Sequence, residues 1–162
     1  MRRKKTTAHG EFVPKNPEKY VGKRPIIYRS SWELTVCRFF DLHPYVLGWS
    51  SESIEIPYEN PIKKARTGNG WTVYIPDFLV VYADKNGRRH AELVEIKPLK
   101  QRPDYVPKPG ERISREDREA QVINKAKWIA AAKFCAKRGL HFRVASEDEL
   151  FAWNRSKKST KK

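Results

Sequence analysis

Two β-prone segments, residues 71–82 and 90–97, are joined by a turn that contains the pair Asn86-Gly87. Asn-Gly is the strongest short signal for a β-hairpin, because both residues tolerate the positive φ that a tight turn requires. The first segment, WTVYIPDFLVVY, is rich in β-branched and aromatic residues. The two segments therefore predict a pair of antiparallel strands, and Pro76 implies an edge, a bend or a bulge in the first of them.

Helical periodicity, β-propensity and capping residues predict the elements that surround this hairpin. Helices are expected at residues 30–41, 114–138 and 146–153, and short strands at residues 53–57 and 140–145. The resulting order is α-β-β-β-α-β-α, with no internal repeat. The sequence thus predicts an α/β fold in which a mixed central sheet is flanked by helices.

The chain has 162 residues, enough for one compact domain with tails. We expect a basic arm at residues 1–19, a single domain at 20–153 and a basic tail at 154–162. Lys and Arg number 34 against 19 Asp and Glu, and a net charge of +15 favours a polyanionic partner such as nucleic acid. The apolar run at residues 78–83 is far shorter than the roughly 18 residues of a membrane helix. No membrane partner and no small-molecule cofactor are expected.

Three charged side chains on the two predicted strands can lie close together. Asp77 interrupts an otherwise apolar strand face, and Glu95 and Lys97 share one face of the partner strand because strand side chains alternate. A hairpin can bring all three around one point. Two adjacent carboxylates repel, so one of them is protonated near neutral pH unless a cation bridges them. The alternatives are a buried Asp77 paired with Arg or Lys, and a solvated Lys97 at a strand end.

Oxygen ligands of this kind favour a hard cation, Mg²⁺ or Mn²⁺. Lys97 beside such a cation could hold an attacking water and screen the negative charge that develops on a phosphate. The three residues together therefore predict metal-assisted chemistry on a phosphate ester.

The pattern Pro76-Asp77, followed by Glu95-Ile96-Lys97, resembles the PD-(D/E)xK nuclease superfamily, which has the restriction-endonuclease-like fold. The predicted element order matches the α-β-β-β-α-β core of that superfamily. The resemblance implies that a further acidic ligand comes from the first helix, where Glu33 stands. Glu33 can equally close a capping box with Ser30, and both interpretations stay open.

Residues 16–33 (NPEKYVGKRPIIYRSSWE), 48–58 (GWSSESIEIPY) and 76–78 (PDF) are more specifically similar to head-completion nucleases of T-even-type tailed bacteriophages. This resemblance implies a Mg²⁺-dependent endonuclease, with Mn²⁺ as a substitute, that processes or secures the packaged DNA end at the portal. The catalytic set carried over is Glu33, Asp77, Glu95 and Lys97, and the backbone carbonyl of Ile96 joins the metal ligands.

The implied partners are double-stranded DNA and portal or neck proteins, in the cytoplasm of the infected bacterium or retained in the virion neck. Expected DNA contacts lie at the start of the first helix and beyond the strand that carries Lys97: Arg29, Ser30, Ser31, Lys100, Arg102 and Arg115.

Two other functions fit the same residues. One is a neck or portal plug that keeps the nuclease fold and grips DNA without cutting it. The other is a PD-(D/E)xK endonuclease subunit of a transposase or repair system. Such a transposase subunit would be inactive without its companion protein.

Overall fold

The computed structural model describes residues 8–23 and 25–150. Its central sheet has the strand order β3-β6-β7-β8. The strands are β3 (Val46–Ser51), β6 (Phe78–Ala83), β7 (Arg89–Ile96) and β8 (His141–Ala145). The pairs β3–β6 and β6–β7 are antiparallel, and β8 runs parallel to β7. The predicted mixed sheet is confirmed. Within the described ranges, no helix combines the length and apolar character that a bilayer-spanning segment needs.

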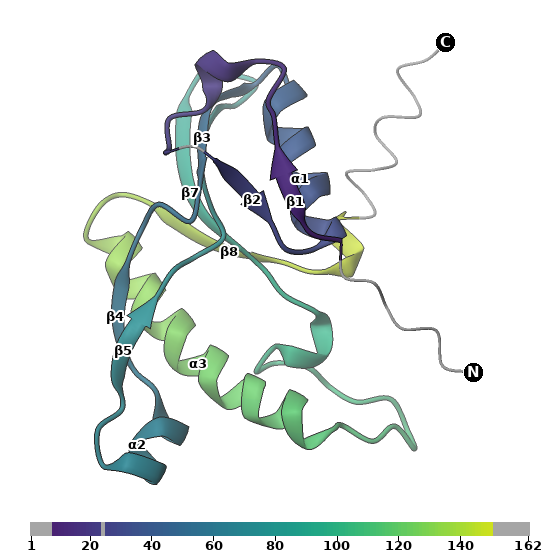
Figure 1. Ribbon diagram of the computed structural model, residues 1–162, viewed down its shortest axis with the longest axis vertical. Coiled ribbons are helices and arrows are strands. Elements are labelled where there is room, and N and C mark those ends of the chain that lie inside the picture. The colour runs from purple at the N-terminus through teal and green to yellow at the C-terminus, as the bar shows by residue number, and fades with distance from the viewer. Residues whose placement is uncertain (1–7, 24, 151–162) are drawn as a thin grey trace.

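One helix covers each face of this sheet (Figure 1). On one face, Phe40 of α1 (Ser31–Leu42) packs in the same core cluster as Phe78 and Val94. On the other face, Ala131 of α3 (Arg115–Ala136) packs in a cluster with Leu93. Val94 and Leu93 are consecutive residues of β7. Because strand side chains alternate, Val94 packs on the α1 face of the sheet and Leu93 on the α3 face.

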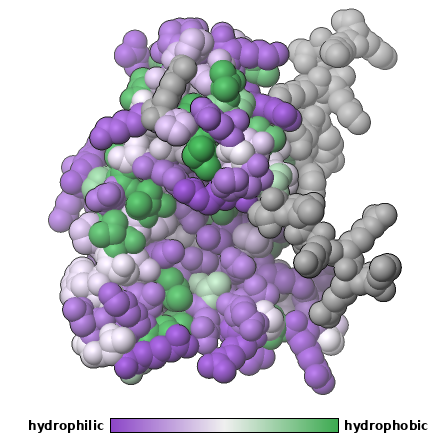
Figure 2. Space-filling view, viewed as in Figure 1, coloured by the Kyte–Doolittle hydropathy of each residue, from purple (hydrophilic) through white to green (hydrophobic). Residues whose placement is uncertain are grey.

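A two-stranded arm projects beside α3, as Figure 1 shows. It consists of β4 (Ile56–Glu59), the short helix α2 (Pro61–Thr67) and β5 (Trp71–Tyr74). A second small sheet near the N-terminus pairs β1 (Gly10–Phe12) with β2 (Ile26–Tyr28), and the 3₁₀ turns η1 (Pro17–Lys19) and η2 (Leu99–Gln101) complete the described elements. Hydrophilic side chains cover most of the face drawn in Figure 2, and its hydrophobic side chains form small separate patches.

The structure confirms the predicted hairpin: β6 pairs with β7, and Gly87 in the connecting turn has a φ of 77°. It also places α1, α3 and β8 where helical and strand patterns predicted them, and Gly139 after α3 has a φ of 66°. The strand predicted at residues 53–57 is wrong in position, because β4 begins at Ile56. The first strand of the core is instead β3, which sequence patterns did not indicate.

Residues 10–19, expected as part of a basic arm, lie within the folded body through the β1–β2 pairing. Residues 1–7, the basic tail at 154–162 and the end of the helix predicted at 146–153 lie outside the described residues. Residues 147–150 are helical, as that prediction requires.

Asp41, at the end of α1, anchors this N-terminal segment. Its carboxylate accepts hydrogen bonds from the backbone amides of Lys15 (2.8 Å) and Asn16 (2.9 Å). The residue is buried, with 1% of its surface exposed. A buried carboxylate is tolerated when it is hydrogen-bonded, and here it is also the acceptor that the two amides need.

We expect Asp41→Ala to lower the free energy of unfolding by roughly 2 to 4 kcal/mol, because two amides lose their acceptor. Urea denaturation followed by circular dichroism measures this change. Glu18→Ala removes an exposed acid from the same segment and serves as the control. Equal stability of the two variants would contradict the anchoring role.

Candidate active site

Asp77 lies at a break between two strands that belong to different sheets. The sequence predicted one strand over residues 71–82, but the chain leaves β5 after Tyr74 and enters β6 at Phe78. Pro76 stands in the gap, where its missing N–H removes a ladder bond. The single-strand prediction is therefore wrong. Because of this break, Asp77 lies just before the start of β6, outside the regular hydrogen-bond ladder of the central sheet.

The register of the hairpin brings Asp77 next to Glu95. Phe78 pairs with Val94, so the next position on each strand is Asp77 and Glu95. The Asp77 carboxylate also accepts a hydrogen bond from the backbone amide of Ile96, with 2.7 Å between N and Oδ2. The predicted meeting of these two acids is present in the structure.

Glu95 is buried, with 3% of its surface exposed, and each of its carboxylate oxygens has a partner. The Tyr74 hydroxyl donates to Oε2 at 2.8 Å. The Lys97 ammonium lies 3.3 Å from Oε1. Burial, followed by the charge of Glu95, raises the pKa of the Tyr74 hydroxyl, so Tyr74 stays a donor across the physiological range.

Burial raises the pKa of Asp77 well above its ordinary value, and the negative charge of Glu95 raises it further. The Ile96 amide and the positive charge of Lys97 act in the opposite direction. Folding thus places two carboxyl groups so close together that ionisation of both is unfavourable. The carboxylate oxygens of Asp77 and Glu95 carry more negative charge than the neighbouring groups neutralise, and they are the kind of ligand that a hard divalent cation prefers.

Glu33 forms the helix cap that the sequence offered as one of its two interpretations. Its backbone amide donates to Ser30 Oγ at 3.1 Å, and its Oε2 accepts from the Arg29 amide at 2.8 Å. Its negative charge still contributes to the raised pKa of Asp77. Among the described residues, however, no three acidic, His or Cys side chains form a cluster that could hold a metal. The structure therefore brings Asp77, Glu95 and Lys97 together, and keeps Glu33 at the cap.

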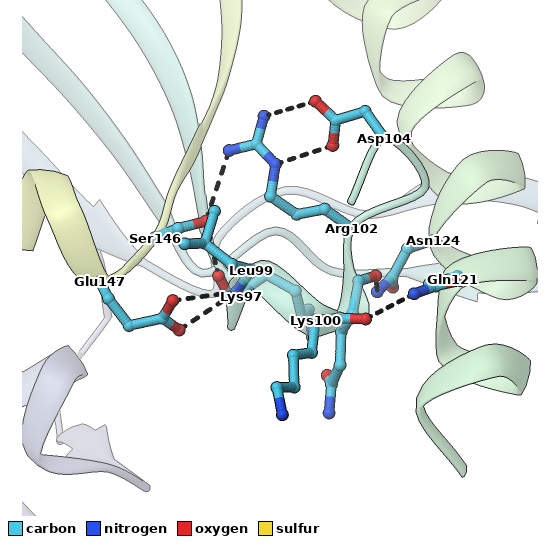
Figure 3. Close-up of polar contacts among 10 residues, drawn as sticks. Lys97, Leu99, Lys100, Arg102, Asp104, Gln121, Asn124, Ser146 and Glu147 are labelled. Carbon is cyan, nitrogen blue, oxygen red and sulfur yellow. Dashed lines mark hydrogen bonds and ion pairs between the residues drawn. The ribbon is translucent and has the colours of Figure 1, made fainter. Parts of the chain in front are cut away.

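The chain beyond Lys97 is held by hydrogen bonds that the sequence did not predict (Figure 3). Ser146, after β8, donates to the Lys97 carbonyl at 2.8 Å, and Glu147 accepts from the Leu99 amide. From α3, Gln121 donates to the Lys100 carbonyl at 2.7 Å. These bonds fix the end of the strand that carries Lys97. A buried polar residue on α3, Asn124, takes part by donating to the Gln101 carbonyl, and its helical spacing to Ala131 and Cys135, the other buried residues of α3, was the available sequence signal.

The basic residues expected to contact DNA already have acidic partners. The ion pairs are Arg29 with Glu52, Lys100 with Glu111, Arg102 with Asp104, and Arg115 with Glu119. Ser30 Oγ serves the helix cap, and Ser31 is the exposed first residue of α1. Lys100 and the Tyr105 hydroxyl lower the pKa of Glu111 to about 2. A phosphate that reached these cations would have to replace an internal partner, so their DNA contacts remain a prediction.

Residues 43–147 match the sequence model of a family described as the TnsA-like endonuclease N-terminal domain. Fold and match together define a restriction-endonuclease-like nuclease. Over 150 residues the chain is also 33% identical to the head completion nuclease of Enterobacteria phage T4, a match that covers 88% of this chain and 93% of that protein. The chain belongs to the head completion nuclease family, and the resemblance seen in residues 16–33, 48–58 and 76–78 is confirmed.

The raised pKa of Asp77 predicts that the stability of the metal-free protein depends on pH. An unfolded Asp has a pKa of about 3.9, so folding favours the protonated form, and stability is lost as pH rises from about 4 through the raised value. Asp77→Asn removes the charge and should raise stability in EDTA by on the order of 1 kcal/mol at pH 8, with less gain at pH 4. Thermal denaturation at both pH values measures this.

Asp148→Asn makes the same chemical change at an exposed residue and is the matched control. An Asp77→Asn protein that is less stable than wild type at pH 8, or that gains equally at pH 4, would show that Asp77 is not strained by its neighbour.

Proposed function

We propose that this nuclease is a divalent-metal-dependent DNA endonuclease of the PD-(D/E)xK type. The observation that carries the proposal is the pairing, by strand register, of two electrostatically coupled carboxyl groups, Asp77 and Glu95, with the Lys97 ammonium 3.3 Å from Glu95. The substrate is double-stranded DNA, and the reaction is hydrolysis of a phosphodiester bond. The net charge of +15 supports a polyanionic substrate.

Mg²⁺, or Mn²⁺ in its place, would be held by Asp77, Glu95 and the Ile96 carbonyl. The family resemblance adds Glu33, whose carboxylate serves the helix cap in this structure. Such an ion supplies Lewis-acid stabilisation of charge on the phosphate. Lys97 orients the attacking water and stabilises the negative charge that develops as the water adds. Tyr74 fixes the Glu95 carboxylate through its 2.8 Å hydrogen bond, which keeps that acid in one orientation.

The name of the T4 relative, which refers to head completion, supports a proposed biological setting. By this similarity, the protein acts in the cytoplasm of an infected bacterium, where it processes or secures the packaged DNA end at the portal. Portal and neck proteins would be its partners, with retention in the virion neck.

Cleavage of supercoiled and linear DNA tests the enzyme. We expect cutting with Mg²⁺ and none with EDTA, and we expect Lys97→Gln to lower the cleavage rate about 100-fold or more with little change in DNA affinity. Gel assays of cleavage and fluorescence anisotropy of labelled DNA measure the two quantities. Lys85→Gln, in the exposed hairpin turn, is the control for loss of one positive charge.

Metal-independent binding without cutting would identify a DNA-gripping plug and refute the enzyme. Equal loss of binding and cleavage in Lys97→Gln would contradict the proposed role of Lys97. Restoration of cutting by a companion protein would indicate the transposase-type alternative.

Glu33→Gln separates the two roles of Glu33. Glutamine keeps the oxygen that caps the helix, since Gln also occurs in capping boxes, but it removes the negative charge. If Glu33 also binds the metal, cleavage at limiting Mg²⁺ should fall at least 10-fold while the melting temperature stays near that of wild type. A variant with unchanged Mg²⁺ dependence would leave Glu33 as a cap alone.

A further inference from the structure

Lys127 of α3 reaches the face of the sheet on which Glu95 lies. Its side chain is half-buried, and its ammonium lies 5.2 Å from the centre of the Tyr74 ring and 5.9 Å from that of Tyr58. Both tyrosines belong to the arm formed by β4, α2 and β5. A cation over two aromatic faces is held in a defined place by the negative charge of those faces.

The Tyr74 ring links Lys127 to the catalytic carboxylates. Tyr74 donates to Glu95 Oε2, whereas Lys97 contacts the other oxygen, Oε1. Burial lowers the pKa of Lys127, and the charge of Lys97 lowers it further, while Glu95 and Asp77 raise it. The ammonium of Lys127 is thus within electrostatic reach of the three residues at the centre of the site.

The tyrosine rings and the nearby acids compensate the charge of Lys127 only in part, since burial still lowers its pKa. Within residues 8–23 and 25–150, Lys127 forms no ion pair with a carboxylate, although its ammonium is partly removed from water. Burying a positive charge without a direct anionic partner costs free energy. Methionine would pack on the same two rings without that cost. A lysine at this position is favourable when an anion completes its environment.

We propose that Lys127 is a second phosphate-binding lysine of the site, which contacts a backbone phosphate of the DNA strand at the cleavage point from the Tyr74 side of Glu95. The inference rests on the proposed nuclease function. Lys97 then acts on the reacting phosphate in the transition state, and Lys127 holds a backbone phosphate in the bound state, on the other side of the Glu95 carboxylate. One lysine comes from the central sheet and the other from α3, so the bound strand lies between them.

Three variants test this contact. Lys127→Met keeps the apolar stem on the tyrosine rings and removes the charge, and Lys127→Arg keeps the charge. Lys125→Met removes one charge two positions away on the same helix, on its opposite and exposed side. For each, we would measure single-turnover cleavage of a linear duplex with Mg²⁺, DNA affinity in EDTA over a series of salt concentrations, and the melting temperature.

We expect Lys127→Met to lower the cleavage rate about 100-fold. The slope of log affinity against log salt should become less steep by about 0.9, the loss of one phosphate contact. Lys127→Arg should restore the slope, and Lys125→Met should resemble wild type in rate and slope. A structural role would lower the melting temperature and the rate but leave the slope unchanged.

An unchanged slope in Lys127→Met, or equal slopes in Lys127→Met and Lys125→Met, would overturn the proposal even if wild type cuts DNA. A wild type that never cuts but shows the slope change only at Lys127 would refute the nuclease function and retain the phosphate contact.

Discussion

The hydrogen bond from the Ile96 amide to the Asp77 carboxylate fixes the geometry on which the site depends. It ties the start of β6 to the end of β7, and so holds the hairpin in the register that makes Asp77 and Glu95 neighbours. A shift of one residue would turn Glu95 to the α1 face of the sheet, because side chains alternate. Strand pairing and catalytic geometry are therefore the same constraint.

Groups around this hydrogen bond reduce the repulsion between the carboxyl groups of Asp77 and Glu95. Two adjacent carboxyl groups destabilise the folded state. The Lys97 ammonium just after β7 and the Tyr74 hydroxyl of β5 stabilise Glu95, and the Ile96 amide stabilises Asp77. The clamp of Ser146 and Glu147 then holds the strand end that these contacts use. Under the proposed function this arrangement exchanges stability for activity, since groups that would bind a cation and a phosphate fit poorly without them.

Local sequence patterns predicted the structural features that depend on neighbouring residues, such as turns, helix caps and helix ends. The Asn-Gly turn, the capped helix that contains Glu33 and the long helix that ends before Gly139 were all readable, and with them the meeting of Asp77, Glu95 and Lys97. β3 was not, because Gly48 and two serines weaken its strand signal. Pro76 predicted an edge, a bend or a bulge in the strand, but which sheet each half joins depends on tertiary pairing. The ring contacts of Lys127 depend on the rotation of α3, which periodicity leaves open.

The break at Pro76 also divides the molecule into two parts that can change separately. β5 pairs with β4 in the arm, and β6 pairs within the central sheet. Residues 65–70 lie at the tip of that arm, where they include the end of α2. A loop that lengthens or shortens there leaves the β6–β7 register intact. Related nucleases could thus diversify the surface that meets a substrate or a partner, while the hydrolytic centre is inherited unchanged.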